Sequence, residues 1–457
     1  MKFFHLADLH LGKSVYEHSL LPDQRHILDQ VTAAVRAESP VAVIIAGDVF
    51  DRAVPPPEAV RLFGDFLAEL KAIDPDLVIA VIPGNHDSAA RLAFASGILG
   101  LSGVHIRADA KDAVIPVTIQ RDGELVRLWL LPFLSPGALT PEMLPEAMGI
   151  SGDHSPGEKL SEAQPSGAQL PVVQRPEIPP SESLVQFGVG LQDLEMVSVV
   201  ASSKPVEPLL LRSQADLFAA AISMIQRAMV SIPGGLKSPP ARAVTDILVC
   251  HAFATGGSAG ESERVFLGSA ELVDPALFNA FDYVALGHLH RCQSAGDKGM
   301  YAGSPIAYAF SEGRVDRGFL VVDVRLGSFA AEFRLVRPLR RMVRISGSYD
   351  QVLQDPLWQE YEGDYIEAIL DDADAVLNPM GPLRERFPFL LSLKQAAFEM
   401  VSGSGQDLDA TQGDGQDGTL AEDDFVAFHQ ELRGCPPDEA LMELFTQLYR
   451  EATDEAR

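Results

Sequence analysis

Short apolar runs alternate with stretches of helical spacing through the first part of this chain. Phe3–Ala7, Val41–Ala46 and Leu77–Ile82 are rich in branched residues, whereas Asp23–Ala37 and Pro57–Ile73 have the apolar spacing of helices. Such runs suit strands that are buried on both faces. Strand–helix–strand alternation predicts an α/β fold, in which helices cover a parallel or mixed sheet. Further strand-like runs follow at Arg127–Leu131, Asp246–Cys250 and Asp282–Leu286.

The pattern changes several times along the 457 residues, which are enough for two or three domains. Residues 151–183 are rich in Ser, Gly, Pro, Gln and Glu and cannot easily bury a core. We expect a main domain over 1–340 with a mobile insertion at 151–212, a smaller domain over 341–401, a linker at 402–421 and a helical tail over 422–457.

The tail carries two apolar stripes at helical spacing. The first contains Phe425, Phe428 and Leu432, and the second contains Leu441, Leu444, Phe445 and Leu448. Such stripes either pack on the protein's own core or dock to a partner, and the Gly-rich linker before them favours a tethered docking element.

Composition excludes several classes of protein. No apolar run approaches the roughly 18 residues of a membrane helix, and Asp8 and His10 interrupt the N-terminal run too early for a signal peptide, so we expect a cytoplasmic protein without membrane contact. Three distant cysteines argue against a disulfide framework. The net charge of −28 excludes a uniformly basic nucleic-acid binder. From Asp350 onward the net charge is −19, which leaves only −9 for the rest and room for a local basic groove.

Five short polar motifs each follow a strand-like run, where open α/β sheets place their ligands. They are Asp8-Leu9-His10, Gly47-Asp48, Gly84-Asn85-His86-Asp87, His251, and Gly287-His288-Leu289-His290. Any one of them is more often a plain turn, but the ordered set is not. Mixed oxygen and imidazole ligands suit manganese, iron or zinc better than calcium. Two such ions can activate a water and neutralise both oxygens of a phosphoester displacement.

This ordered set resembles the calcineurin-like metallophosphoesterase superfamily. The longer blocks HLADLHLGK, AGDVFDRAVPP, PGNHDSAARL, GGSAGESER, FDYVALGHLHR and YAGSPIAYAFSE are similar to the SbcD family, the nuclease subunits of bacterial SbcCD complexes. The resemblance covers about residues 1–345 without the insertion, and the tail more faintly. It implies a metallophosphoesterase four-layer sandwich, two mixed sheets flanked by helices, with an α+β capping domain and a helical C-terminal tail.

The resemblance also implies roles for individual residues. Asp8, His10, Asp48 and His290 would hold one divalent metal, and Asp48, Asn85, His251 and His288 the other, with Mn²⁺ as the expected ion. His86 would be the catalytic histidine and Asp87 would orient it. Arg52 and Arg91 are candidates for contact with DNA phosphates, although solvated surface arginines are equally common.

The resemblance therefore implies a metal-dependent DNA exonuclease/endonuclease for repair, recombination and replication. It would cleave duplex ends and hairpins with an SbcC-type coiled-coil ATPase, as a homodimer within a heterotetramer. Two alternatives stay open, because the metal motif alone does not choose a substrate: a phosphoesterase acting on a non-DNA substrate, and a non-catalytic scaffold. The insertion at 151–212 and the acidic C-terminal region depart from the family pattern without touching the metal set.

Overall fold

The computed structural model describes residues 1–121, 123–139, 213–231, 244–258, 272–325 and 328–396, and residues 425, 437, 441, 442, 445 and 446. The expected insertion at 151–212 and linker at 402–421 lie outside the described residues, as does most of the tail. No helix in the described part of the chain is long and apolar enough to cross a membrane.

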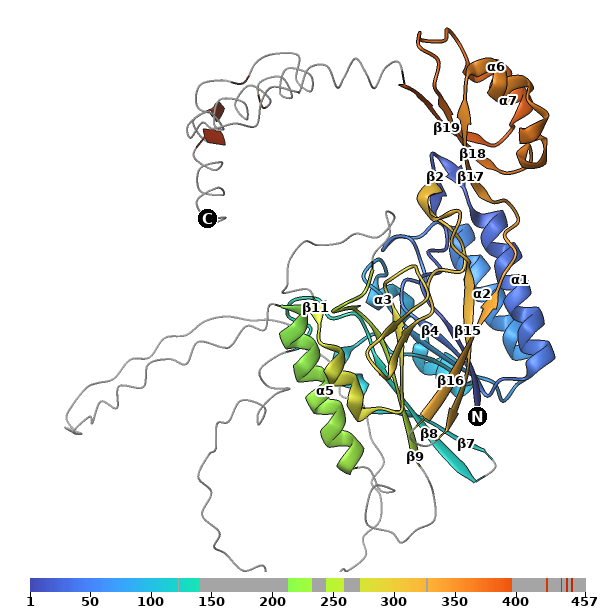
Figure 1. Ribbon diagram of the computed structural model, residues 1–457. Coiled ribbons are helices and arrows are strands. Elements are labelled where there is room, and N and C mark those ends of the chain that lie inside the picture. Colours follow the sequence, from blue (N-terminus) through green and yellow to red (C-terminus); the bar gives the residue numbers. More distant parts are fainter. Residues whose placement is uncertain are drawn as a thin grey trace, which may run out of the picture.

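One mixed sheet has the strand order β16-β15-β1-β4-β5-β6. Figure 1 labels β4, β15 and β16 of this sheet. Its parallel strands are β1 (Lys2–Leu6), β4 (Ala42–Ala46), β5 (Val78–Ile82) and β6 (Val104–Ile106). Strands β15 (Gly318–Arg325) and β16 (Ser328–Leu335) extend it as an antiparallel hairpin. The three N-terminal apolar runs form β1, β4 and β5, as the sequence predicts.

A second mixed sheet has the order β13-β14-β12-β9-β8-β7. Strands β8 (Glu124–Leu131), β9 (Val244–His251), β12 (Tyr283–Gly287) and β14 (Gly299–Tyr301) are parallel. The edge strands β7 (Val117–Arg121) and β13 (Gln293–Ala295) pair antiparallel to their neighbours.

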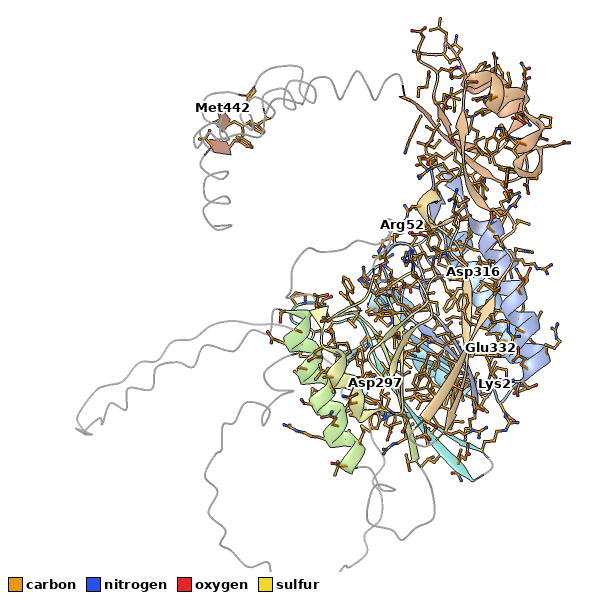
Figure 2. The ribbon with its side chains drawn as sticks, viewed as in Figure 1. Lys2, Arg52, Asp297, Asp316, Glu332 and Met442 are labelled. Atoms are coloured by element: carbon orange, nitrogen blue, oxygen red, sulfur yellow. The ribbon has the colours of Figure 1, made fainter. Side chains whose placement is uncertain are left out.

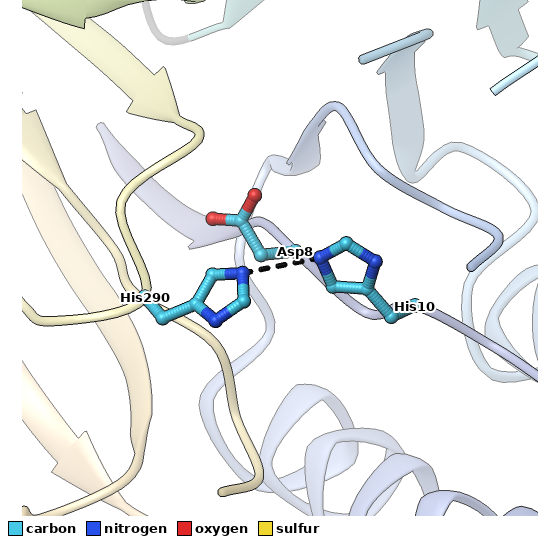
Figure 3. Close-up of side chains that lie close together, drawn as sticks. All are labelled: Asp8, His10 and His290. Carbon is cyan, nitrogen blue, oxygen red and sulfur yellow. Dashed lines mark hydrogen bonds between the residues drawn. The ribbon is translucent and has the colours of Figure 1, made fainter. Parts of the chain in front are cut away.

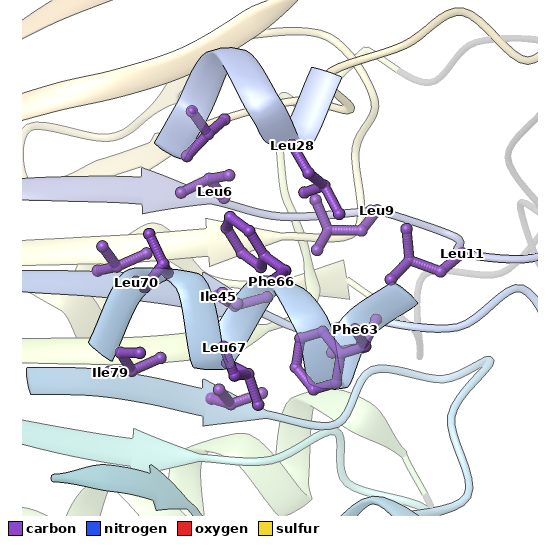
Figure 4. Packing of buried hydrophobic residues seen from close by; sticks show 14 of the residues in the cluster. Leu6, Leu9, Leu11, Leu28, Ile45, Phe63, Phe66, Leu67, Leu70 and Ile79 are labelled. Atoms are coloured by element: carbon purple, nitrogen blue, oxygen red, sulfur yellow. The ribbon is translucent and has the colours of Figure 1, made fainter. Parts of the chain in front are cut away.

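The two sheets pack face to face and helices cover both outer faces. Phe3, Ile44, Leu130, Val249 and other fully buried residues fill the space between the sheets. Helices α1 (Leu21–Glu38) and α2 (Pro57–Ile73) cover the first sheet, as Figure 4 shows for their contacts with its apolar residues. Helix α5 (Gln214–Ser231) covers the second. The predicted four-layer sandwich of two mixed sheets is confirmed.

A third, smaller sheet is built from β17 (Met342–Gly347), β18 (Tyr365–Leu370) and β19 (Leu390–Gln395). All three strands are parallel, which requires crossovers, and α6 (Tyr349–Gln354) and α7 (Met380–Arg386) supply them. The helices and one sheet face bury Ile345, Ile366 and Phe387. Met342 and Tyr365 pack instead on the main sandwich, beside Ile306 and Leu20. This unit therefore has its own small core and a contact with the sandwich.

Short elements complete the described chain. They are the hairpin β2 (Ser14–Val15) with β3 (His18–Ser19), the helices α3 (Ala89–Leu92) and α4 (Ser96–Leu101), the strand pair β10 (Phe253–Ala254) with β11 (Leu272–Val273), and the 3-10 turns η1 (Ala110–Val114), η4 (Pro275–Ala280), η5 (Phe310–Glu312) and η6 (Pro356–Tyr361).

Candidate metal centre

The five polar motifs all follow carboxyl ends of parallel strands. β1, β4 and β5 end just before Asp8, Asp48 and Asn85 in the first sheet. His251 ends β9, and His288 follows β12, in the second. Because the sheets are stacked, these strand ends meet, and the seven expected metal ligands form one cluster of contacts.

Asp8, His10 and His290 form one group of possible ligands (Figure 3). One ligand atom from each lies within 4.8 Å of the others, and all three side chains are buried. The Nε2 atoms of His10 and His290 are 3.1 Å apart. Two imidazole nitrogens that bind one ion at a right angle, with bonds of about 2.1 Å, lie roughly 3 Å apart. The spacing therefore fits two ligands of one ion.

Asp8, Asp48 and His251 form a second group with the same spread. Asn85 joins it, because its Oδ1 lies 3.0 Å from His251 Nε2 and 3.2 Å from His288 Nδ1. Asp48 Oδ2 is 3.5 Å from His251 Nε2 and 3.6 Å from His10 Nε2. The Asp48 carboxylate is thus close to ligand atoms of both groups.

His86 lies against the same cluster from the loop after β5. Its Nδ1 donates to the carbonyl oxygen of Asp51 at 2.8 Å, and its ring meets that of His10 edge-on at 4.8 Å. The backbone N–H of His86 donates to Asp48 Oδ1 at 2.9 Å. With the proton on Nδ1, Nε2 is left for a substrate oxygen. One ligand atom of His86 is also within 4.8 Å of ligand atoms of His10 and Asp48.

Asp87 does not orient the His86 ring directly, contrary to the expectation from sequence. Its carboxylate accepts backbone N–H groups of Gly84, Val49 and Phe50 at 2.9–3.0 Å. It therefore ties the loop after β5 to the loop after β4, and the carbonyl of Asp51 holds the ring instead.

Several candidate ligands have a left-handed backbone. Asp8, His10, Asp48 and His288 have φ angles of 53°, 39°, 48° and 107°. Non-glycine residues rarely adopt such angles, which cost about 1–3 kcal/mol each and concentrate at functional sites. These left-handed turns at the strand ends direct side chains from different strands toward the same cluster.

Glycines let the two sheets approach at this point. A Cβ at Gly287 would lie 1.8 Å from the carbonyl oxygen of Ala46, and a Cβ at Gly84 would lie 2.2 Å from Asp48 Oδ1. Neither position has room for a side chain, so glycine is required for close approach.

A supporting set of side chains was not predicted from the sequence. Tyr308 donates to the carbonyl of Leu9 at 2.7 Å, and Gln24 Nε2 donates to that of His10 at 2.7 Å. Arg317 Nη1 donates to the carbonyl of His290 at 2.5 Å. These partners bind backbone carbonyls, so no local motif marks them. Tyr308 does lie in the YAGSPIAYAFSE block, which was the one available signal.

The electrostatics favour cation binding. Burial raises the pKa of Asp8 to about 7. Burial would also raise the pKa of Asp48, but the nearby His251 and His10 outweigh it and hold that pKa below its usual range. Burial opposes the protonation of His251, yet Asp48 raises its pKa to about 9. Among the described residues no lysine or arginine forms an ion pair with either carboxylate, so buried negative charge and imidazole donors fit divalent cations.

The candidate DNA contacts, Arg52 and Arg91, are both exposed, and Figure 2 labels Arg52. Neither side chain forms an ion pair with a described residue. Their placement at the surface is compatible with either a phosphate contact or solvation.

The fold and this cluster are similar to those of calcineurin-like phosphoesterases: residues 1–133 match the family model described as "Calcineurin-like phosphoesterase". Divalent metals are the cofactors this class and these donors support. The chain is also similar along most of its length to proteins named as the D subunit of the SbcCD nuclease. The Staphylococcus saprophyticus protein is 27% identical to this chain, in an alignment that covers 87% of this chain and 86% of the relative. That of Staphylococcus epidermidis is 26% identical with the same coverage. The resemblance to the SbcD family is thereby confirmed.

A solved dimetal phosphatase from Danio rerio aligns with 73% of this chain and 98% of its own at 12% identity and a TM-score of 0.32. A likeness of that size supports no inference about this chain.

Proposed function

We propose that this chain is the nuclease subunit of an SbcCD-type complex, which hydrolyses phosphodiester bonds of DNA at duplex ends and hairpins together with an SbcC-type ATPase. The observation that carries the proposal is the buried Asp, His and Asn cluster in a chain that is similar over 87% of its length to nucleases of that name. The cluster supplies the hydrolytic chemistry, and the similarity supplies the substrate and the partner.

The proposed ligand sets keep the assignment from sequence. Asp8, His10, Asp48 and His290 hold one ion, and Asp48, Asn85, His251 and His288 hold the other, with Asp48 shared. Two divalent ions would supply Lewis acidity to the phosphate and an activated water. We propose Mn²⁺, because the mixed oxygen and imidazole donors suit it.

His86 is the proposed proton carrier. Its Nδ1–H group donates a hydrogen bond to the carbonyl oxygen of Asp51 at 2.8 Å. Nε2 is therefore the ring nitrogen that would face a bound phosphate. In the protonated imidazole, Nε2 can donate to the leaving oxygen as the ester bond breaks. Asp87 holds the loop that carries His86 through the backbone of Val49, Phe50 and Gly84.

The sheet over Met342–Gln395 is the proposed capping domain, within the predicted limits of 341–401. It packs on the sandwich through Met342 and Tyr365, beside the β2–β3 hairpin. We propose that it helps to place DNA, and that the tail beyond the linker docks to the ATPase. Phe425 and Phe445, one from each apolar stripe, stack with ring centroids 4.2 Å apart, which supports pairing of the two stripes.

We also propose that the subunit forms a homodimer within the complex. Phe94, Ile98 and Leu101 are 82%, 73% and 89% exposed on the α3–α4 segment. Three large apolar side chains so exposed within eight residues favour a protein interface.

The decisive experiment is a nuclease assay on linear duplex and hairpin DNA, with the full chain, the SbcC-type partner, ATP and Mn²⁺. Cleavage that needs Mn²⁺ and is lost in His86→Ala supports the proposal. Turnover of a small phosphodiester without any DNA cleavage would favour the non-DNA phosphoesterase. Circular duplex without ends separates endonuclease from exonuclease activity. Fewer than about one bound ion per chain would favour the scaffold.

A further inference from the structure

A second concave site lies where the smaller sheet meets the main sandwich. It has a volume of about 510 Å³ and is lined by the segments around Ile306, Val315, Val336 and Met342, and by Tyr365. Asp316, which also lines it, is labelled in Figure 2. The size is that of small-molecule sites, which are typically about 300–1,000 Å³. None of the proposed metal ligands lines this pocket, which we call the junction pocket.

Arginines dominate the polar lining of the junction pocket. Five of them line it, with Asp316 as the one carboxylate, and they are Arg314, Arg317, Arg337, Arg340 and Arg341. The whole chain has 64 acidic and 36 basic residues, so a chance lining would be richer in acids. The guanidinium group is the side chain best suited to bidentate binding of phosphate.

Three of the five arginines are held in place by acidic neighbours. Arg317 Nη2 lies 2.9 Å from Glu312 Oε2, and Arg341 Nη2 lies 2.6 Å from Asp364 Oδ2. Arg340 Nη1 lies 3.3 Å from Asp23 Oδ2, and its guanidinium also stacks on the ring of Phe389 at 4.2 Å. These contacts fix the arginines and reduce the entropy lost when a ligand binds.

The other two, Arg314 and Arg337, are not neutralised. Both side chains are exposed, and in the described part of the chain neither guanidinium has an ion-pair or hydrogen-bond partner. The backbone of Arg337 is anchored by Gln30, whose side chain bonds its N–H at 2.9 Å and its carbonyl at 2.8 Å. The two free cations therefore lie at one cavity, and the backbone of Arg337 is held in place.

We propose that the junction pocket binds a phosphate group of a nucleotide, held by Arg314 and Arg337. The apolar part of the lining, with Val336, Met342 and the Tyr365 ring, offers a surface for a base or sugar. The phosphate can belong to a free nucleotide or to a nucleotide unit of a DNA strand, and the chemistry of recognition is the same. The proposal stands apart from the metal centre and does not depend on nuclease activity.

The pocket has a direct link to the metal centre. Arg317, at its wall, donates to the carbonyl of His290 at 2.5 Å and to Ser304 Oγ at 2.7 Å. For this reason Arg317 is unsuitable as a test position, and the exposed Arg314 and Arg337 are the residues to change.

The test measures binding to the full chain freed of metal by a chelator, so that the metal centre holds little phosphate. Isothermal titration with AMP, and with adenosine as the phosphate-free control, is compared for wild type and the double variant Arg314→Glu/Arg337→Glu. We expect about one AMP per chain, no binding of adenosine, and at least a tenfold weaker Kd in the double variant. The matched control is Arg227→Glu, an exposed arginine on α5 that should leave the Kd unchanged.

A second arm uses a short labelled DNA duplex in the same buffer. Duplex binding that depends on Arg314 and Arg337, without AMP binding, assigns the phosphate to the DNA backbone. AMP binding that depends on Arg314 and Arg337 assigns the phosphate to a free nucleotide. The proposal is overturned if neither probe binds saturably, or if Arg227→Glu weakens binding as much as the double variant. Circular dichroism, and Mn²⁺ content measured before the chelator is added, are both expected to match wild type and exclude misfolding as the cause.

Discussion

Gly84→Ala is a sharp test of the metal centre, because the substitution adds one methyl group at its most crowded point. The new Cβ would lie 2.2 Å from Asp48 Oδ1, 2.4 Å from the Asp48 backbone nitrogen and 2.8 Å from Asp48 Cγ. Ordinary van der Waals contact begins near 3.4 Å. The φ angle of Gly84 is not in the left-handed region, so lack of space is the main obstacle.

The expected effect is large on activity and moderate on stability. Restoring contact requires a shift of about 1 Å at the Asp48 carboxylate or at the Gly84 loop, whereas metal ligands tolerate only about 0.2 Å. A misplacement of about 1 Å near a reacting centre can cost about 100-fold in rate. Overpacking costs about 1–3 kcal/mol of unfolding free energy. We therefore expect at least a 100-fold loss of kcat and fewer than two bound ions.

The assay measures Mn²⁺-dependent hydrolysis of a small phosphodiester and of linear duplex, bound metal by mass spectrometry, and urea unfolding. Gly64→Ala in α2 is the matched control, because a Cβ there would meet no atom within 4 Å beyond its chain neighbours and the backbone of its own helix. In a helix interior this change should stabilise the protein by up to about 1 kcal/mol. A Gly84→Ala protein with two ions and activity within twofold of wild type would refute the proposed position of Asp48 as the shared ligand.

Three further outcomes are expected. His86→Ala should lower kcat about 10²- to 10⁴-fold while two ions stay bound, because His86 is outside the proposed ligand set; loss of metal would instead make it a ligand. Tyr308→Phe removes the donor to the Leu9 carbonyl and should lower the unfolding free energy by about 1 kcal/mol in urea titrations, so an unchanged midpoint would contradict this role. Leu101→Asp should convert a dimer to a monomer in analytical ultracentrifugation, and Leu377→Asp, at a residue that is 90% exposed elsewhere, should not.

The local sequence determined the strands and the chemistry of this protein. Uncharged apolar runs such as Val41–Ala46 have one stable place, a strand covered on both faces, and β4 is completely buried. The polar motif that follows each run then had to lie at the carboxyl end of the strand that the run forms. This is why Asp48, Asn85 and His251 could be predicted as ligands before their contacts were known. The four-layer sandwich was implied by the family resemblance instead.

Only the tertiary structure decided which of these residues meet. His10 and His290 are 280 positions apart, and their 3.1 Å contact depends on the stacking of two separate sheets. The same limit explains the error at Asp87, whose partners Val49 and Phe50 lie on another loop. Sequence patterns record which face of an element is buried, because that follows from local periodicity. They do not record which distant residues approach one another, because packing decides that. The proposed shared position of Asp48 and the junction pocket both depend on such long-range approach.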